Sequence, residues 1–241
     1  MSIKNTLKQI IKKIPIAFTR NQQYDKQTTL IIQKVCKSGS NTIDIGCHTG
    51  EVMDIILKSA PQGTHYGFEP IPDLVSRLKV KYQNMPNCRI NDVALSNQKG
   101  TSTFNYVISN PAYSGLKKRK YARENEQDTQ ITVQTDTLDN VLPADWKVDL
   151  IKIDVEGGEL LVLEGAVNTI KRTKPVIVFE HGTGASEFYG STPEKVFDLL
   201  ASCGLKMSLM RNWLENKPPL TKEELRKIYD RNSDYYFIAY P

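Results

Sequence analysis

Charged residues crowd the end of one strongly apolar segment of the chain. The segment 151–159 reads IKIDVEGGE, and its charged positions are Lys152, Asp154, Glu156 and Glu159. Burying a charge costs free energy unless the charge is paired, so a cluster at the end of a buried strand indicates a functional site. A structural alternative is that Lys152 pairs with one acid, and that Glu159 favours the N-terminus of a following helix. We expect the structural role for Glu159 and a role in the site for Asp154 and Glu156.

A glycine-containing turn, DIGCHTGE at 44–51, follows another apolar segment. Gly46 and Gly50 would let a ligand approach the backbone closely, and a helix that starts after them would present free N–H groups. A dinucleotide site would show G-x-G-x-x-G here, whereas this turn has G-x-x-x-G. Asp44 would repel a pyrophosphate. The turn therefore suits a ligand that carries an ammonium and a sulfonium group.

Two further acids stand where apolar segments end. Glu69 follows the segment 66–68, nineteen residues after Gly50. In nucleotide-binding α/β sheets an acid at this place accepts hydrogen bonds from ribose hydroxyls. A helix cap or a surface ion pair is the alternative. Asp92 could accept a hydrogen bond from an adenine amino group, or it could be a turn residue. We expect both acids to bind the ligand, because they form an ordered series.

Strand-like and helix-like segments alternate along most of the chain. The segments predicted as strands are 42–45, 66–68, 88–95, 148–155, 175–180, 206–210 and 235–240. The segments predicted as helices are 27–36, 51–58, 73–82, 159–170, 193–201 and 221–230. Strands that are apolar along their whole length are buried on both faces. This pattern indicates a mostly parallel sheet that is covered by helices on both sides.

One long polar connection interrupts the alternation. It spans residues 108–130 between two further predicted strands, 102–107 and 131–135, and it contains the basic run KKRK at 117–120. A connection of this length inside a compact domain is typical of a lid or of a disordered segment. We expect it to cover an acceptor. The basic run could attract a phosphorylated acceptor such as a nucleotide-sugar, or it could form only a solvated face.

The composition predicts a soluble α/β protein. Of the 241 residues, 39% are hydrophobic and 24% are charged, which is enough apolar material for the core of one full-sized domain. The four cysteines and three histidines show no spacing typical of a disulfide framework or a metal site. No apolar run is long enough for a membrane span or for the core of a signal peptide. We therefore expect a cytoplasmic location.

The basic charge is concentrated at the N-terminus. Residues 1–40 carry eight lysines and arginines against one acid, and the rest of the chain sums to −2. A nearly neutral body argues against a broad nucleic-acid interface. Residues 1–16 place apolar side chains on one face of a helix, which would pack on the domain or rest on an anionic membrane surface. We expect residues 1–38 to form a basic helical leader and residues 39–241 to form the main domain.

Several of these stretches together resemble the FkbM-type methyltransferase family. They are DIGCHTGE at 44–51, FEP at 68–70, VALS at 93–96, TLD at 137–139, and IKIDVEGGE at 151–159 followed by LEGA at 163–166. The resemblance covers roughly residues 42–181. The chain departs from the family at His48, where an asparagine is more usual.

The resemblance implies a single-domain class I methyltransferase fold. This fold is Rossmann-like, with a seven-stranded, mostly parallel sheet whose last strand runs antiparallel. The resemblance also implies that S-adenosylmethionine is the cofactor, and that its methyl group passes to a hydroxyl of a sugar, a glycan or another small molecule. The residues expected to bind the cofactor are Asp44, Gly46, His48, Gly50, Glu51, Glu69, Pro70, Asp92, Val93 and Ala94.

Methyl transfer to a hydroxyl requires a positioned acceptor oxygen and a group that removes its proton. We expect Asp154 to be this base and Glu156 to orient the acceptor. His181 is the alternative base, because an imidazole titrates closer to neutral pH. A divalent ion held by Asp154, Glu156 and Glu180 is a further alternative, which we rank below a metal-free mechanism because carboxylates have many structural uses.

Three other classes of protein compete with this interpretation. A nicotinamide-dependent oxidoreductase would share the sheet, but the G-x-G-x-x-G turn is absent. A nucleic-acid methyltransferase would need a basic face on the body of the protein. A non-catalytic, membrane-associated scaffold would use the N-terminal helix and leave the cofactor site without a function.

Overall fold

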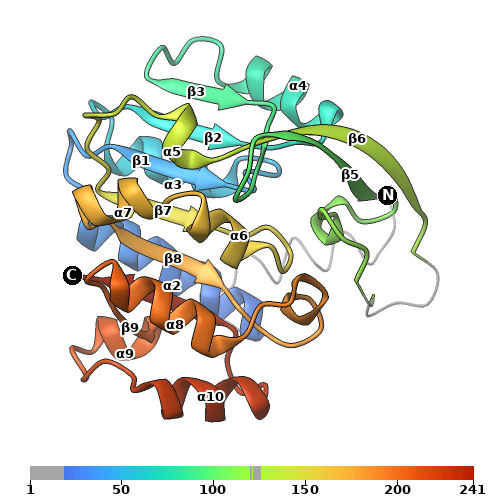
Figure 1. Ribbon diagram of the computed structural model, residues 1–241. Coiled ribbons are helices and arrows are strands. Elements are labelled where there is room, and N and C mark those ends of the chain that lie inside the picture. Colours follow the sequence, from blue (N-terminus) through green and yellow to red (C-terminus); the bar gives the residue numbers. More distant parts are fainter. Residues whose placement is uncertain (1–18, 120, 122–125) are drawn as a thin grey trace.

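The computed structural model describes residues 19–119, 121 and 126–241. The predicted helix at 1–16 lies outside these residues, as does part of the basic run of the long connection. The described chain folds around one central sheet that has helices on both sides (Figure 1).

The central sheet has seven strands in the order β3-β2-β1-β7-β8-β10-β9. Their bounds are β1 (Thr42–Ile45), β2 (His65–Phe68), β3 (Cys88–Asn91), β7 (Leu150–Ile153), β8 (Val176–Glu180), β9 (Lys206–Leu209) and β10 (Tyr236–Tyr240). The first five strands in this order pair in parallel, and β10 runs antiparallel to both of its neighbours. This confirms the predicted Rossmann-like class with its antiparallel last strand.

Helices bury both faces of the sheet, because side chains alternate along each strand. Leu150 belongs to an apolar cluster that also contains residues of α2 (Arg20–Val35), α3 (Glu51–Ser59), α4 (Pro72–Lys81) and α9 (Met210–Leu214). Ile151, the next residue, packs in the opposite cluster. The helices of that face are α5 (Leu138–Val141), α6 (Glu159–Glu164), α7 (Val167–Thr173), α8 (Pro193–Ser202) and α10 (Lys222–Asp230). Both clusters are apolar, which explains why the strand segments show no polar alternation.

A second, three-stranded sheet stands beyond the carboxyl ends of β1 and β2 (Figure 1). It consists of β4 (Ala94–Leu95), β6 (Asp128–Asp136) and β5 (Gly100–Val107), in that order. The prediction of one strand over 88–95 is therefore wrong. The chain leaves the central sheet after Asn91, and Ala94 pairs with Thr135 of the second sheet. The strands predicted at 102–107 and 131–135 are confirmed as parts of β5 and β6.

Two helix predictions need correction. The segment predicted as one helix over 159–170 contains two, α6 and α7, because the chain turns at Gly165. A β-carbon at this glycine would overlap the backbone carbonyl of Ser96, so the close approach requires glycine. The helix predicted at 27–36 begins earlier, at Arg20, where Thr19 forms a capping box with Gln22.

Helix α2 contributes to the core of the domain. Its buried side chains Tyr24, Ile31 and Ile32 lie in the same cluster as Leu150 of β7. This part of the predicted leader therefore packs against the central sheet. Within the part of the chain that the structure describes, no helix is both long and apolar enough to cross a membrane.

Candidate active site

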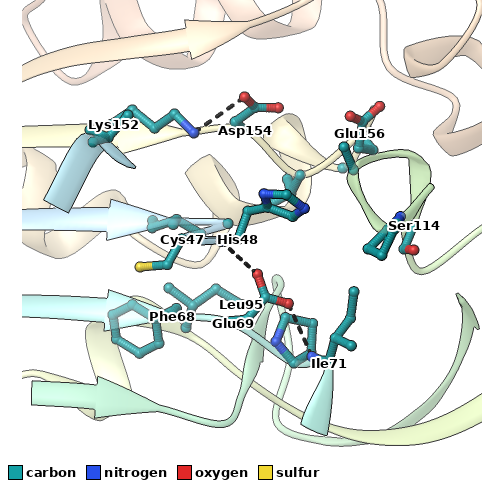
Figure 2. Close-up of a pocket in the computed structure, with 18 of the residues that line it drawn as sticks. Cys47, His48, Phe68, Glu69, Ile71, Leu95, Ser114, Lys152, Asp154 and Glu156 are labelled. Atoms are coloured by element: carbon teal, nitrogen blue, oxygen red, sulfur yellow. Dashed lines mark hydrogen bonds and ion pairs between the residues drawn. The ribbon is translucent and has the colours of Figure 1, made fainter. Parts of the chain in front are cut away.

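A cavity of about 320 Å³ opens at the carboxyl ends of β1, β2 and β7. Parallel α/β sheets bind ligands at this edge, where successive strands deliver polar side chains to one place. Figure 2 shows Glu69 on one side of this cavity, Asp154 on the other, and His48 between them. The wall opposite the sheet comes from the connection after β5, which includes Pro111 and Ser114. We call this space the strand-end cavity.

The turn after β1 forms the floor of the strand-end cavity. Gly46 has a φ of +79°, and a β-carbon there would overlap the backbone carbonyl oxygen of Asp154. Glycine is therefore needed for both its conformation and its size. Gly50 also has a positive φ, but it starts α3 and lies against Tyr82. Gly46 shapes the cavity, whereas Gly50 serves the packing of α3.

Glu69 lies where the prediction placed it, at the end of β2 and on the wall of the strand-end cavity. Its two oxygens accept hydrogen bonds from His48 N at 2.9 Å and from Ile71 N at 3.0 Å (Figure 2). Burial raises the pKa of its carboxyl group, and these two backbone bonds oppose the shift. Each carboxylate oxygen has a second lone pair, so Glu69 can also accept hydrogen bonds from a diol.

An apolar slot lies beside Glu69. The side chains that form it are Phe68, Ile71, Leu95 and Phe104. Among the other predicted cofactor residues, Glu51, Pro70, Val93 and Ala94 also line the strand-end cavity. The slot can hold a flat, apolar ring next to a carboxylate that accepts hydroxyl hydrogens, which matches an adenosine group.

Asp44 and Lys152 form a buried pair beneath the strand-end cavity. They are partners in the register of β1 and β7, and Lys152 Nζ lies 4.0 Å from Asp44 Oδ1. Burial raises the pKa of Asp44 to about 6, although Lys152 acts in the opposite direction. Asp44 does not line either described cavity. Its prediction as a direct ligand of the cofactor ammonium is not supported by this position.

Asp154 lies just beyond the end of β7 and is held from two sides. Lys152 Nζ donates a hydrogen bond to Asp154 Oδ2 at 3.2 Å (Figure 2), and the hydroxyl of Tyr236 donates to the same oxygen at 2.6 Å. Burial alone would raise the pKa of Asp154, but the Lys152 charge and these hydrogen bonds hold it below its usual value. Asp154 therefore stays ionised, with its orientation fixed by charge-assisted hydrogen bonds.

Glu156 and Glu180 bring two more carboxyl groups to Asp154. Their ligand oxygens lie within 4.8 Å of one another. Burial and the neighbouring Asp154 raise the pKa of both glutamates well above the usual value. Arg119 of the long connection pairs with Glu156. The three carboxyl groups could ligate a divalent cation, but Lys152 and Arg119 already supply positive charge to them.

A second cavity, of about 420 Å³, adjoins the first. It lies between the beginning of α2, the beginning of β10 and the segment after β8. We call this space the side cavity. The residues that line both cavities are Tyr24, Asp25, Ala112, Asp154, Glu156 and Tyr236. The carboxylates at 154 and 156 therefore stand where two separate binding spaces meet.

Besides Asp44 and Gly50, two more predicted site residues line neither cavity. Asp92 is exposed and lies 3.7 Å from Lys79, because the chain turns outward between β3 and β4. His181 is 1% exposed and stacks on Tyr229 of α10, on the face of the sheet opposite α2. Both predictions therefore need correction. Asp92 is a surface residue, and His181 is a buried structural residue.

Sequence reasoning missed several residues of the site. Tyr236 of β10 donates a hydrogen bond to Asp154, and Tyr24 of α2 packs against the ring of Tyr236 and lines both cavities. Nothing in the local sequence marks either tyrosine. Arg119 belongs to the basic run, for which the sequence predicted attraction of a phosphorylated acceptor or a solvated face. In the structure it pairs with Glu156 and lies over the ring of Tyr113.

The chain is similar to known methyltransferases in sequence and in fold. The 2-O-methyltransferase NoeI of Sinorhizobium fredii (strain NBRC 101917 / NGR234) is 25% identical over 178 residues, 66% of this chain and 70% of that protein. The crystal structure of methyltransferase FkbM from Methylobacillus flagellatus KT aligns with a TM-score of 0.50 and 14% identity. That alignment covers 85% of this chain and 44% of the other, so the chain spans less than half of that protein.

A third similar protein is the O-methyltransferase from Bacillus cereus in complex with SAH, with a TM-score of 0.49, 10% identity, and coverage of 98% of this chain and 87% of that one. The alignment with the Methylobacillus flagellatus protein supports the fold alone. The sequence model of the methyltransferase FkbM domain matches residues 44–207, which is more than half of the chain and includes the glycine turn, Glu69 and the carboxylates after β7. The chain belongs to the FkbM methyltransferase family.

Proposed function

We propose that this methyltransferase takes its methyl group from S-adenosylmethionine and transfers it to a hydroxyl group of a sugar or glycan. The observation that carries the proposal is the position of Asp154 and Glu156 on the wall that two adjoining cavities share. A two-substrate transfer requires two binding spaces that meet at the reacting atoms. The name of the NoeI relative, a 2-O-methyltransferase, favours oxygen as the acceptor atom.

The strand-end cavity fits S-adenosylmethionine. Glu69 would accept hydrogen bonds from the ribose hydroxyls, and the slot beside it would hold the adenine ring. Lys152 is the one cation among the described residues that line this cavity, against several carboxylates. That excess suits a ligand with an ammonium and a sulfonium group. When bound, the cofactor supplies a methyl group that is activated by the positive charge on sulfur.

The chain supplies the base. Asp154 would accept the proton of the acceptor hydroxyl as its oxygen becomes nucleophilic, and Lys152 and Tyr236 keep the carboxylate ionised and aimed. Glu156, beside it, would orient the acceptor. His181 cannot replace Asp154 as the base, because its ring lies in the core on the other face of the sheet.

The test uses Asp154→Asn, which keeps the shape of the side chain and removes the base. Methyl transfer to an acceptor should fall about 10²–10⁴-fold, the usual range for general-base catalysis. Calorimetry should show nearly unchanged binding of S-adenosylhomocysteine. Near-normal transfer by the variant would reject Asp154 as the base, and tight binding of NAD in place of S-adenosylhomocysteine would reject the proposed function. Transfer that is abolished by a chelator would favour the cation alternative at Asp154, Glu156 and Glu180.

A further inference from the structure

The side cavity carries information about the acceptor. It is reached from the strand-end cavity past Asp154, and its wall comes from elements outside the glycine turn, namely α2, β10 and the segment after β8. Since the strand-end cavity fits the cofactor, the adjoining space with the same carboxylate on its wall is the place for the acceptor. The charge of its lining then limits which acceptors can enter.

Carboxylates dominate the charge of the side cavity. The acids on its wall are Asp25, Asp154, Glu156 and Glu180, and the one cation among its described residues is Arg119. The Arg119 guanidinium forms an ion pair with Glu156, and its Cζ lies 4.7 Å from the centroid of the Tyr113 ring. If Glu156 and Glu180 are ionised, the wall carries a net negative charge. If both carry protons, Asp25 and Asp154 are balanced by Arg119 and by Lys152, which pairs with Asp154. In neither state do the described residues leave an unbalanced positive charge for a phosphate.

The other described cations of the basic run do not change this charge. Lys118 pairs with Asp128 at 2.7 Å, and Lys117 Nζ lies over the ring of Tyr189. Neither lysine lines the side cavity. The hypothesis that the basic run attracts a phosphorylated acceptor therefore finds no support in this arrangement.

The uncharged residues of the wall offer partners for hydroxyl groups. Asn21, Thr183, Asn232 and Tyr235 add amide and hydroxyl groups to the carboxylates. Carboxylate oxygens accept hydrogen bonds from hydroxyls, whereas a phosphate has no hydrogen to donate near neutral pH and is repelled by them. The combination favours a polyol without a negative charge.

We propose that the side cavity binds an uncharged glycosyl unit and discriminates against the phosphorylated or nucleotide-linked form of the same sugar. The proposal rests on the proposed function, because it takes the strand-end cavity as the cofactor site. It narrows the acceptor to sugars that carry no phosphate, which are free glycosides or units of an assembled glycan.

The experiment measures binding, so that it does not depend on turnover. The full chain is saturated with S-adenosylhomocysteine and titrated with methyl glycosides of hexoses, 6-deoxyhexoses and N-acetylhexosamines. The corresponding sugar 1-phosphates and UDP-sugars are titrated in parallel, and binding is followed by saturation-transfer NMR. For the best-binding sugar, we expect the methyl glycoside to bind at least about ten-fold more tightly than its 1-phosphate.

Two variants show whether the charge of the wall causes this preference. Asp25→Asn removes one negative charge from the side cavity while keeping the side-chain size, because this acid lines the cavity and is exposed to solvent. It should reduce the preference for the methyl glycoside over the 1-phosphate at least about three-fold. Glu223→Gln removes the same charge from the exposed surface of α10 and should leave the preference unchanged. Thermal denaturation shows that each variant is folded before its affinities are compared.

Several results would overturn the proposal. Equal or tighter binding of the phosphorylated sugar would do so, as would equal effects of the two variants, or the lack of binding by every methyl glycoside while S-adenosylhomocysteine binds. Failure of S-adenosylhomocysteine itself to bind would instead reject the proposed function, so the two failures are distinguishable.

Discussion

The buried imidazole of His181 should make the fold sensitive to acid. The side chain is 1% exposed, its ring stacks on Tyr229 with 5.2 Å between the centroids, and neither ring nitrogen has a hydrogen-bond partner among the described residues. Burial lowers the pKa of His181 from 6.5 to about 4. The imidazole is therefore neutral in the folded protein over a pH range in which the unfolded chain becomes protonated.

The size of this effect follows from the two pKa values. Because the unfolded chain binds the proton more readily, the free energy of unfolding falls as the pH drops below about 6.5, and the loss is complete below about 4. A difference of 2.5 pKa units corresponds to a total of about 3.4 kcal/mol. Between pH 7.5 and pH 4.5, we expect His181 to account for about 2.5 kcal/mol of lost stability.

The assay is urea denaturation of the native protein and of His181→Leu at both pH values. Asp44 and Glu159, whose pKa values burial raises to about 6 and about 7, titrate in both proteins and cancel in the comparison. The variant starts with its own packing cost at pH 7.5, but it should then lose about 2.5 kcal/mol less than the native protein on acidification. If both proteins lose the same amount, His181 is not a buried neutral imidazole and its assignment to the core is wrong.

Three other variants test the site. Gly46→Ala should destabilise the fold by about 2–4 kcal/mol, seen as a lower melting temperature, because its β-carbon would overlap the Asp154 carbonyl; an unchanged melting temperature would contradict this contact. Glu69→Gln should weaken S-adenosylhomocysteine binding by about 1–3 kcal/mol in calorimetry, and unaltered affinity would place the ribose elsewhere. Lys152→Met should lower the free energy of unfolding by about 3–5 kcal/mol, because Asp44 and Asp154 lose their buried counter-ion.

The fold could be predicted because its strands are buried on both faces. Apolar runs such as 42–45 and 148–155 contain β1 and β7, and the turns between elements carry glycine, proline or a capping residue. The cofactor side of the site was predictable for a related reason. Glu69 and Asp154 lie immediately after strands, and parallel strands bring their carboxyl ends to one edge. For residues that directly follow parallel strands, their positions in the sequence are therefore enough to predict that they lie in one site.

The side cavity could not be predicted in this way. Tyr24 and Asp25 belong to a helix that precedes the first strand, and Tyr236 begins the last strand. They line the same cavities as Asp154 only because β10 lies beside β8 and α2 packs against the sheet there. The prediction that Asp92 binds the ligand was wrong for a different reason. The chain leaves the central sheet directly after Asn91, so the expected order of strand-end residues no longer applies.

The misplacement of His181 shows what sets the direction of a side chain at the edge of the sheet. In an extended segment successive side chains point to opposite faces, so Glu180 and His181 cannot enter the same cavity. Glu180 is the register partner of Tyr236, and its side chain lines the side cavity with residues of α2. The side chain of His181 points to the opposite face of the sheet, where it stacks on Tyr229 of α10. The register therefore selects the glutamate for the site, although the imidazole has the more suitable ordinary pKa.

The same register explains why charges are buried across this end of the sheet. Asp44, Lys152 and Glu180 lie on β1, β7 and β8, on the face where apolar residues such as Leu150 and Val178 fill the preceding positions. Continuing that apolar pattern would be compatible with the fold and would avoid the cost of burying charges. Lys152 lines the strand-end cavity, Glu180 lines the side cavity, and Asp44 is the register partner of Lys152. The proposed function accounts for this cost, because Lys152 holds the Asp154 carboxylate where the two cavities meet.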